Sequence, residues 1–213
     1  MAFERVLVLA PHTDDGELGC GGTIAKLLES GDDVYYVALS AAEKSVPPNM
    51  PNDVLRREVK QATQVLGIPP ENLLIFNYEV RDFPLHRQAI LEDLIRLKGE
   101  IRPRLVLLPA FHDIHQDHIT VASEGLRAFK TTTILGYELP WNNMTFNTTA
   151  FVFLEERHIN CKIEALSCYV SQRGRRYANG DFIRSLARAR GIQIGAEYAE
   201  AFEVIRWVLD GRL

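Results

Sequence analysis

Short apolar runs alternate with helical patterns along most of this chain, and this alternation constrains the fold more than any other feature. The run at 6–9 is continuously aliphatic, which is typical of a strand buried on both faces of a parallel sheet. The expected strands are 5–10, 34–39, 73–77, 104–109 and 133–137, and the expected helices are 22–30, 53–66, 84–99 and 118–130. This order predicts an α/β fold, a Rossmann-like three-layer α/β/α arrangement with a mostly parallel sheet, in a single domain over residues 1–213.

The last third of the chain has weaker patterns. Residues 150–154 are typical of another strand, 160–172 and 180–190 favour helices, and 202–208 favours a strand although its alternation is less clear. Two stretches show no regular pattern, the proline-rich segment 40–52 and the asparagine-rich segment 138–149. Both are expected to emerge on the rim that carries the polar clusters described next, where irregular loops usually contact substrate.

The first polar cluster directly follows the aliphatic run and reads Pro11-His12-Thr13-Asp14-Asp15. An imidazole nitrogen beside carboxylate oxygens suits a borderline divalent cation such as zinc, and the second carboxylate could then act on metal-bound water. Buried carboxylates would be costly without a cation. The alternative is that Asp14 and Asp15 only cap the following helix, because Asp is common at helix starts.

A second cluster follows the strand expected at 104–109 and holds three of the six histidines of the chain. It reads Phe111-His112-Asp113-Ile114-His115-Gln116-Asp117-His118, and histidines at this density favour a metal or catalytic site. Open α/β sheets place ligands at the carboxyl ends of their strands, so the two clusters are predicted to meet. His12, Asp15 and one histidine of the second cluster would leave a fourth position open, as in catalytic zinc sites.

A second set of metal ligands is possible. His112, His115 and His118 could all bind the metal if their three-residue spacing placed them on one helical face. The aspartates of the first cluster would then have no explanation, so we place His112 at the rim or behind the ligands.

Composition and charge exclude several classes of protein. The 213 residues are 46% hydrophobic and 24% charged, which is ordinary for a soluble globular protein. The net charge is −4, and no Lys/Arg run marks a nucleic-acid surface; the densest basic patch, Arg173-Gly174-Arg175-Arg176, is interpreted as a solvated loop. No signal peptide or membrane span is recognised, which predicts a cytoplasmic protein without membrane insertion. Three cysteines without Cys-x-x-Cys spacing disfavour a disulfide framework and a thiolate zinc site.

Together the clusters resemble the PIG-L/LmbE-like family of zinc-dependent N-acetylglucosaminyl deacetylases. That family opens with a strand and Pro-His-Pro-Asp-Asp, continues with a glycine-rich turn, and later carries His-x-x-His with Asp before the second histidine. The corresponding segments are 11–15, 19–22 and 115–118, with softer similarity at 58–67, 171–172, 190–191 and 198–203. One departure is Thr13, which stands where the family usually has proline.

The resemblance implies a zinc cofactor and assigns its ligands to three positions, His12, Asp15 and His118. It implies that Asp14 is the general base and that His115, oriented by Asp117, stabilises the tetrahedral intermediate. The implied reaction removes the N-acetyl group of an N-acetylglucosamine-type sugar or sugar conjugate, a small-molecule substrate. The family likeness also favours a homo-oligomer.

The arginine that anchors the substrate is less well defined. Many members of the family carry an arginine three residues before Glu58, whereas this chain has Leu55 there. Arg56 and Arg57 are close enough to substitute for it, and His112 is a further candidate for substrate binding. The metal ligands are unaffected by this departure.

Three alternative functions compete with deacetylation. A nucleotide-binding module is suggested by the glycines after the first strand, but Ile24 stands where the last glycine of Gly-x-Gly-x-x-Gly is required. A non-catalytic metal protein is disfavoured because structural zinc sites are usually closed by four ligands. An amidase that acts on a non-sugar acylated amine would use the same residues.

Overall fold

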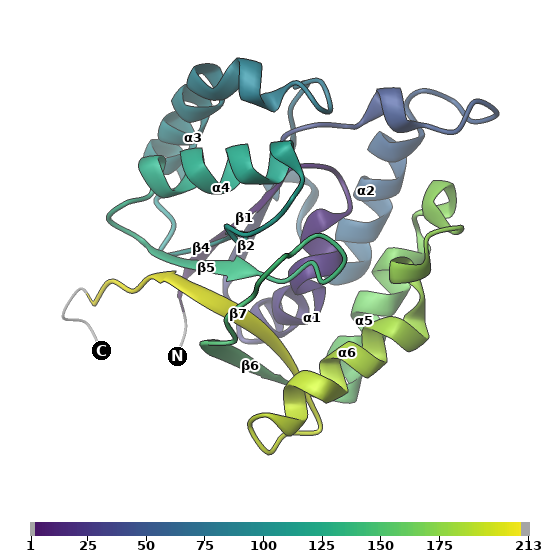
Figure 1. Cartoon of the computed structure of the whole chain (residues 1–213), viewed down its shortest axis with the longest axis vertical. Helices are drawn as coiled ribbons and strands as arrows, with labels where there is room; N and C mark the ends of the chain where they lie inside the picture. Colours follow the sequence, from purple (N-terminus) through teal and green to yellow (C-terminus); the bar gives the residue numbers. More distant parts are fainter. Residues whose placement is uncertain (1–2, 210–213) are drawn as a thin grey trace.

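In the computed structural model, which describes residues 3–209, a seven-stranded sheet is covered by helices on both faces (Figure 1). The strand order is β3-β2-β1-β4-β5-β7-β6, and the first five of these strands are parallel. The strands are β1 (Arg5–Ala10), β2 (Asp33–Ala38), β3 (Leu73–Ile75), β4 (Leu105–Pro109), β5 (Thr133–Tyr137), β6 (Ala150–Leu154) and β7 (Tyr198–Arg206). The predicted three-layer α/β/α fold is confirmed, while both ends of the predicted 1–213 domain lie outside the described residues.

β7 makes the sheet mixed, because it runs antiparallel to both β5 and β6. The strand expected at 202–208 in fact begins at Tyr198, and its first six residues are buried. Glu200 and Glu203 interrupt the apolar pattern of this half, which is why the sequence alone did not extend the strand to its true start.

Six α-helices in the described part of the chain form the outer layers. α1, α2, α5 and α6 pack on one face of the sheet, and α3 and α4 pack on the other. The buried residues of α2 recur every three or four positions, and Gly67, whose φ of 91° favours glycine, caps the helix after Leu66. The helices are α1 (Asp15–Glu29), α2 (Val54–Leu66), α3 (Arg87–Ile101), α4 (Gln116–Ala128), α5 (Glu156–Ser167) and α6 (Gly180–Ile192).

α1 begins well before the helix expected at 22–30. The glycines that suggested a turn lie inside this helix, and two of them face aromatic rings. A Cβ atom at Gly16 would overlap the ring of Tyr36, and one at Gly19 would overlap the ring of Tyr137. Glycine is a poor helix former. At these two positions the need for space beside the aromatic rings outweighs that low helix propensity.

A kink divides α1 at Cys20, whose φ of −145° and ψ of 25° are not helical. The kink leaves backbone N–H groups without helical partners at the start of the second half. The buried carboxylate of Glu200 accepts hydrogen bonds from the N–H groups of Gly22 (3.0 Å) and Thr23 (2.7 Å). The same carboxylate forms an ion pair with Lys162 Nζ at 2.6 Å. Glu200 of β7 therefore caps the second half of α1.

α5 also begins earlier than the expected 160–172, because Glu155 and His158 form a capping box at its first turn. The helix ends at Ser167, and the chain continues through two short 3-10 helices, Val170–Gln172 and Arg176–Ala178. We call residues 168–179 the C-terminal arm. The arm returns to the carboxyl ends of the parallel strands, where the Tyr169 hydroxyl donates a hydrogen bond to the Thr13 carbonyl (2.7 Å).

The centre of the sheet brings the two polar clusters together. β1 and β4 are neighbours, although the chain visits β2 and β3 between them. The helices that follow these two strands lie on opposite faces of the sheet, and residues of the segments 11–14 and 110–115 line a crevice between them. The prediction that the clusters meet at this edge is confirmed. In residues 3–209, every helix is too short or too polar to cross a membrane.

Candidate active site

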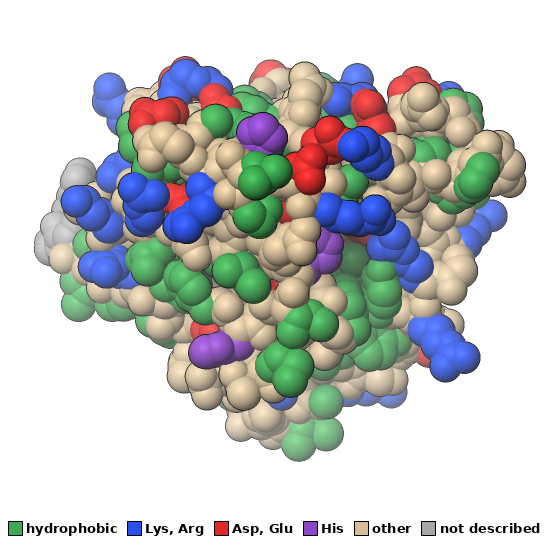
Figure 2. Space-filling model, turned by 45° about the horizontal axis from the view of Figure 1, so that its top comes forward, with side chains coloured by type: hydrophobic (Ala, Val, Ile, Leu, Met, Phe, Trp, Pro, Cys, Tyr) green, Lys and Arg blue, Asp and Glu red, His purple; other side chains and the backbone are tan. Residues whose placement is uncertain are grey.

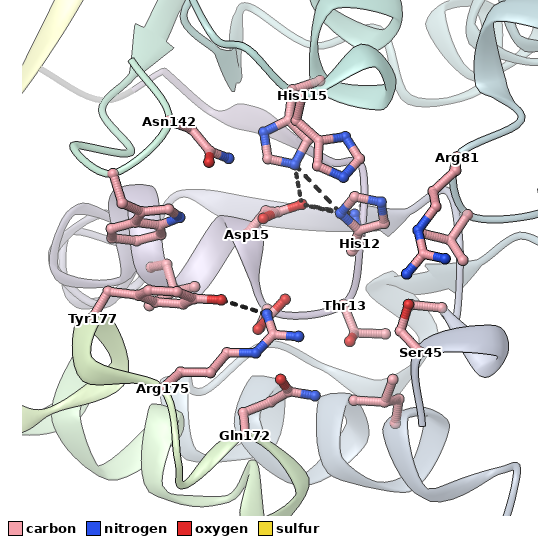
Figure 3. A pocket seen from close by; sticks show the side chains of 17 residues that line it. His12, Thr13, Asp15, Ser45, Arg81, His115, Asn142, Gln172, Arg175 and Tyr177 are labelled. Atoms are coloured by element: carbon pink, nitrogen blue, oxygen red, sulfur yellow. Dashed lines mark hydrogen bonds and ion pairs between the residues drawn. The ribbon is translucent and has the colours of Figure 1, made fainter. Parts of the chain in front are cut away.

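Three side chains from the two clusters, His12, Asp15 and His118, converge in the crevice; Figure 3 labels the first two. The Nδ1 atom of His12 lies 3.1 Å from Oδ2 of Asp15, and Nε2 of His118 lies 3.3 Å from each of these two atoms. Zinc–ligand bonds of about 2.0–2.2 Å at tetrahedral angles separate neighbouring ligand atoms by about 3.3–3.6 Å. The three atoms therefore form one triangular face of the size that a tetrahedral cation requires.

His115 lies beside this triangle. One ring nitrogen from each of His12, His115 and His118 falls within 4.8 Å of the others, so these histidines could also hold an ion together. His112 is exposed in the loop before α4, and His115 is the residue before that helix. The alternative in which three histidines of the second cluster share one helical face is therefore wrong.

Each histidine of the triangle has a carboxylate on its other ring nitrogen. Asp117 Oδ2 lies 2.9 Å from His12 Nε2, and Asp113 Oδ2 lies 2.7 Å from His118 Nδ1. Such partners fix the orientation of the ring and direct its free nitrogen to a metal. Sequence reasoning did not select Asp113, although its place within the histidine cluster was the signal that could have found it.

Asp117 contacts His12, where we expected His115. Its Oδ2 atom is 4.0 Å from His115 Nδ1 and accepts a hydrogen bond from the Arg81 N–H at 2.7 Å. His115 instead caps α4, since its Nδ1 accepts a hydrogen bond from the Asp117 N–H (3.2 Å). Burial and the neighbouring His118 and His12 rings lower the pKa of His115, so we expect a neutral ring whose Nε2–H is a hydrogen-bond donor.

Asp14 is free of the structural role that Asp residues often have at helix starts. It occupies the position before α1, but its side chain makes no capping hydrogen bond. It lines the cavity and is buried, and its pKa is raised by this burial and by the neighbouring charge of Asp15. A carboxylate with this environment is a stronger base than a solvated one.

Buried hydroxyl groups hold the segment that carries Asp14. The Tyr36 hydroxyl donates to the Thr13 carbonyl at 2.9 Å, and the Tyr169 hydroxyl lies 2.7 Å from the same oxygen. Both hydroxyls also contact the carboxyl group of Glu17. Burial raises the pKa of Glu17 to about 8, so its carboxyl group is protonated at neutral pH. The carboxyl O–H can then donate a hydrogen bond within this group of oxygen atoms.

A cavity of about 310 Å³ opens in front of these residues. The irregular segments 40–52 and 138–149 both contribute to it, as predicted from their position on the rim. His112, Arg56 and Arg57 do not line it: Arg56 faces a neighbouring cavity of about 410 Å³, and Arg57 pairs with Asp53 at 2.9 Å. The lining residues are His12, Thr13, Asp14, Asp15, Leu18, Ala42, Ser45, Leu55, Val80, Arg81, His115, His118, Trp141, Asn142, Gln172, Arg175 and Tyr177.

The C-terminal arm and the segment after β3 supply residues that sequence reasoning missed. Residues 173–176 are exposed, as predicted for a solvated loop, but the structure adds that the side chain of Arg175 lines the cavity. Arg81 faces the same cavity from another side. Tyr177 stacks on Trp141 with ring centroids 4.1 Å apart, at the edge of the cavity. These residues are scattered along the chain, so no local pattern marks them.

The chain is similar in sequence to a known family and to known proteins. The chain matches the PIG-L family, described as GlcNAc-PI de-N-acetylase, over residues 7–129. It is 28% identical over 176 residues to the uncharacterized deacetylase YaiS of Escherichia coli (strain K12), which covers 78% of this chain and 90% of YaiS. It is 32% identical over 133 residues to diacetylchitobiose deacetylase of Thermococcus kodakarensis, which covers 59% of this chain and 49% of that protein.

The fold alone does not define the reaction. The crystal structure of GalB, the 4-carboxy-2-hydroxymuconate hydratase of Pseudomonas putida KT2440, has a TM-score of 0.79 and 19% identity, and the match covers 99% of each chain. One fold thus supports hydratase and deacetylase chemistry. The family match, in contrast, spans more than half of the chain and includes both polar clusters. The chain therefore belongs to the PIG-L family, that of GlcNAc-PI de-N-acetylase.

Proposed function

We propose that this protein is a zinc-dependent hydrolase that removes the acetyl group from an N-acetylglucosamine-type sugar or sugar conjugate. The observation that carries the proposal is the triangle of His12, Asp15 and His118, with the carboxylate of Asp14 beside it and unused for capping. The family and its deacetylase relatives support hydrolysis of an acetamide. Diacetylchitobiose deacetylase, by its name, acts on an acetylated sugar.

The donor set fits zinc. One carboxylate and two imidazoles at tetrahedral spacing, with a carboxylate behind each ring, correspond to three protein ligands and an open fourth position. A bound zinc ion would act as a Lewis acid, lowering the pKa of water and polarising the amide carbonyl.

Asp14 and His115 provide the acid–base chemistry in this proposal. Asp14 accepts the proton of the water that attacks the acetamide carbon, since it faces the cavity beside the ligands. His115 donates a hydrogen bond through Nε2–H to the carbonyl oxygen as negative charge builds there. The proton held by Asp14 then passes to the departing amine, so each turnover returns the carboxylate to its starting state.

The cavity walls suit an acetylated sugar. Leu18, Leu55 and Val80 give an apolar lining that an acetyl methyl group can contact. Trp141 and Tyr177, stacked at 11°, present aromatic surface at the edge of the cavity, against which the C–H groups of a sugar ring can pack.

The proposal is tested by measuring acetate release across N-acetylated sugars, sugar conjugates and N-acetylated amines without a sugar. Metal content is determined on the same preparations, and Asp14→Asn is the matched control for contaminating activity. We expect release from N-acetylglucosamine-type substrates by the zinc-loaded protein. Release from non-sugar amines alone would establish the amidase instead. Equal rates for wild type and the Asp14→Asn variant would reject the proposed site.

A further inference from the structure

The asparagine-rich segment 138–149 forms one wall of the cavity, although it contains no helix and no strand of the sheet. Trp141 and Asn142 line the cavity from this segment, and Figure 3 shows Asn142 on the same side as His115. Lys and Arg side chains border the hollow on the face shown in Figure 2, whereas the only charged residue of the segment is Glu138. Because Glu138 does not line the cavity, its carboxylate acts elsewhere.

Arg190 on α6 contacts this segment near both of its ends. The Arg190 Nε atom donates a hydrogen bond to Glu138 Oε2 at 3.0 Å, and its Nη2 atom donates one to Glu138 Oε1. Glu138 is only 7% exposed, so this two-point ion pair is shielded from water. The Arg190 guanidinium carbon also lies 6.0 Å from the centre of the Phe146 ring. One guanidinium group therefore holds the first residue of the segment and a residue close to its end.

Two stretches of the chain with softer family similarity, 190–191 and 198–203, meet at this segment. Arg190 belongs to the first stretch, and Glu203 of the second accepts a hydrogen bond from the Asn147 N–H at 2.8 Å. A Cβ atom at Gly191 would lie 2.6 Å from a carbonyl oxygen of the turn before β7. Glycine there allows the end of α6 to lie close to that turn. The two stretches thus share one task, which is to hold the asparagine-rich segment.

Two backbone hydrogen bonds join the segment to the second polar cluster. The Ile114 N–H donates to the Asn142 carbonyl at 3.1 Å, and the Met144 N–H donates to the His112 carbonyl at 2.9 Å. They bracket Asp113 in a short antiparallel bridge. Since the Asp113 carboxylate holds one ring of the ligand triangle, the position of the segment affects the metal side of the cavity.

We propose that Arg190 is a positioning residue for the active site. Through Glu138 it fixes the asparagine-rich segment, and through the segment it holds Asp113 in place behind the ligand His118. A segment without a helix or strand depends on few contacts for its order, and a planar guanidinium group bound at two points restricts both position and direction. The expected effect on turnover rests on the proposed deacetylase function, whereas the effects on the segment and on zinc need no turnover.

The segment itself is observed through Trp141. In a Trp207→Phe background Trp141 is the only tryptophan, and acrylamide quenching of its fluorescence measures its exposure in protein that circular dichroism shows to be folded. We expect Arg190→Gln to increase the quenching and to shift the emission to the red, because the ring of Trp141 leaves its stacked position on Tyr177. The matched control is Arg188→Gln, an exposed arginine on the same helix that contacts β7.

Zinc affinity and kinetics are measured on the same variants. Competition with a chromogenic chelator should show an affinity lowered by about 3- to 10-fold in Arg190→Gln, less than the loss of about 10–100-fold that follows removal of a direct partner of a ligand. With methyl N-acetylglucosaminide at saturating zinc, KM should rise by about threefold or more while kcat stays near that of the wild type. Arg190→Lys keeps the charge without the planar fork, so it should recover part of each effect.

A double variant shows whether Arg190 acts through Glu138. Arg190→Gln alone leaves the buried Glu138 carboxylate without its partner, which can prevent folding. Glu138→Gln combined with Arg190→Gln removes both charges, so it supplies the test in that case. We expect the double variant to expose Trp141 and to lose no more zinc affinity than the worse single variant, because both changes break one contact. Additive losses would overturn the proposal, and so would unchanged quenching and zinc affinity in folded variants.

The fluorescence measurement distinguishes failure of this inference from failure of the proposed function. If the wild type hydrolyses no acetylated sugar but Arg190→Gln exposes Trp141, the positioning role stands and the deacetylase proposal fails. Hydrolysis by the wild type, with the same quenching, zinc affinity and KM in Arg190→Gln, would reject the positioning role alone.

Discussion

The two sides of the cavity are built in different ways. On the metal side, the side chains of His12, Asp15 and His118 are 12%, 8% and 2% exposed, and a carboxylate fixes each ring from behind. On the arm side, Arg175 is exposed and Tyr177 is half-buried, and a few hydrogen bonds hold the segment in place. The side chains on the metal side constrain one another, whereas those on the arm side are held by fewer contacts and can vary separately. Substitutions on the two sides should therefore have separable effects.

The largest effect is expected from His118→Ala on the metal side. The change removes a ligand nitrogen and leaves the buried carboxylate of Asp113 without its partner, so metal and deacetylase activity should be lost together. Elemental analysis should find about one zinc ion per chain in the wild type and little in the variant. The control is His86→Ala, at an exposed histidine outside the cavity. Full metal occupancy in the His118→Ala protein would remove His118 from the ligand set.

Asp14→Asn should separate turnover from metal binding within the metal side itself. We expect this variant to retain its zinc and to lose about 100-fold or more in kcat, the usual scale of general-base catalysis. The matched change Asp15→Asn should weaken the metal, because Asp15 Oδ2 is a corner of the ligand triangle. Metal content and acetate release are measured on both variants. Loss of zinc in Asp14→Asn, with zinc retained and turnover lost in Asp15→Asn, would exchange the roles of the two aspartates.

Asp113→Asn and Asp117→Asn should have a smaller and similar effect on the metal. Each carboxylate holds one histidine of the triangle, and loss of such a partner usually weakens metal affinity by about 10–100-fold. Competition with a chromogenic chelator gives the affinities. Unchanged affinity in Asp117→Asn, with only the pH dependence of turnover altered, would return Asp117 to the role beside His115 that the sequence suggested.

The sequence predicts the metal side of the cavity better than the arm side. The metal side was readable because its motifs are contiguous and lie at the ends of two strands, where the fold itself brings them together. The partner of Asp117 was not readable in this way. His115 is a near neighbour of Asp117 along the chain, yet the Asp117 carboxylate contacts His12, which is 105 positions away. The α/β layers followed from periodicity, whereas Gly16 and Gly19 concealed the early start of α1, because the aromatic rings that require these glycines come from distant strands.

The arm side could not be predicted because its position depends on contacts between distant segments. Tyr169 and Thr13 are 156 residues apart, and Ser171 and Glu58 are 113 residues apart. A short basic run such as 173–176 is usually a solvated face, and nothing local distinguishes the one arginine that turns into a cavity. The position of Arg175 and Tyr177 beside the cavity is therefore visible only once the tertiary structure is known.

The smallest effect is expected from Ser171→Ala, which tests whether the arm acts only on substrate binding. The change removes the hydroxyl bond to the buried Glu58 carboxylate but keeps the N–H bond, so the arm should loosen without leaving its place. A hydrogen bond to a charged group contributes about 1.5–3 kcal/mol, and part of that loss should appear as a KM raised by about two- to fivefold. Because the ligand triangle makes no contact with Ser171, zinc content and kcat should stay near those of the wild type. Ser167→Ala is the control, since that hydroxyl contacts only the Glu164 carbonyl within α5. Steady-state kinetics and elemental analysis check both variants, and a fall in kcat or zinc in Ser171→Ala alone would show that the two sides of the cavity are coupled.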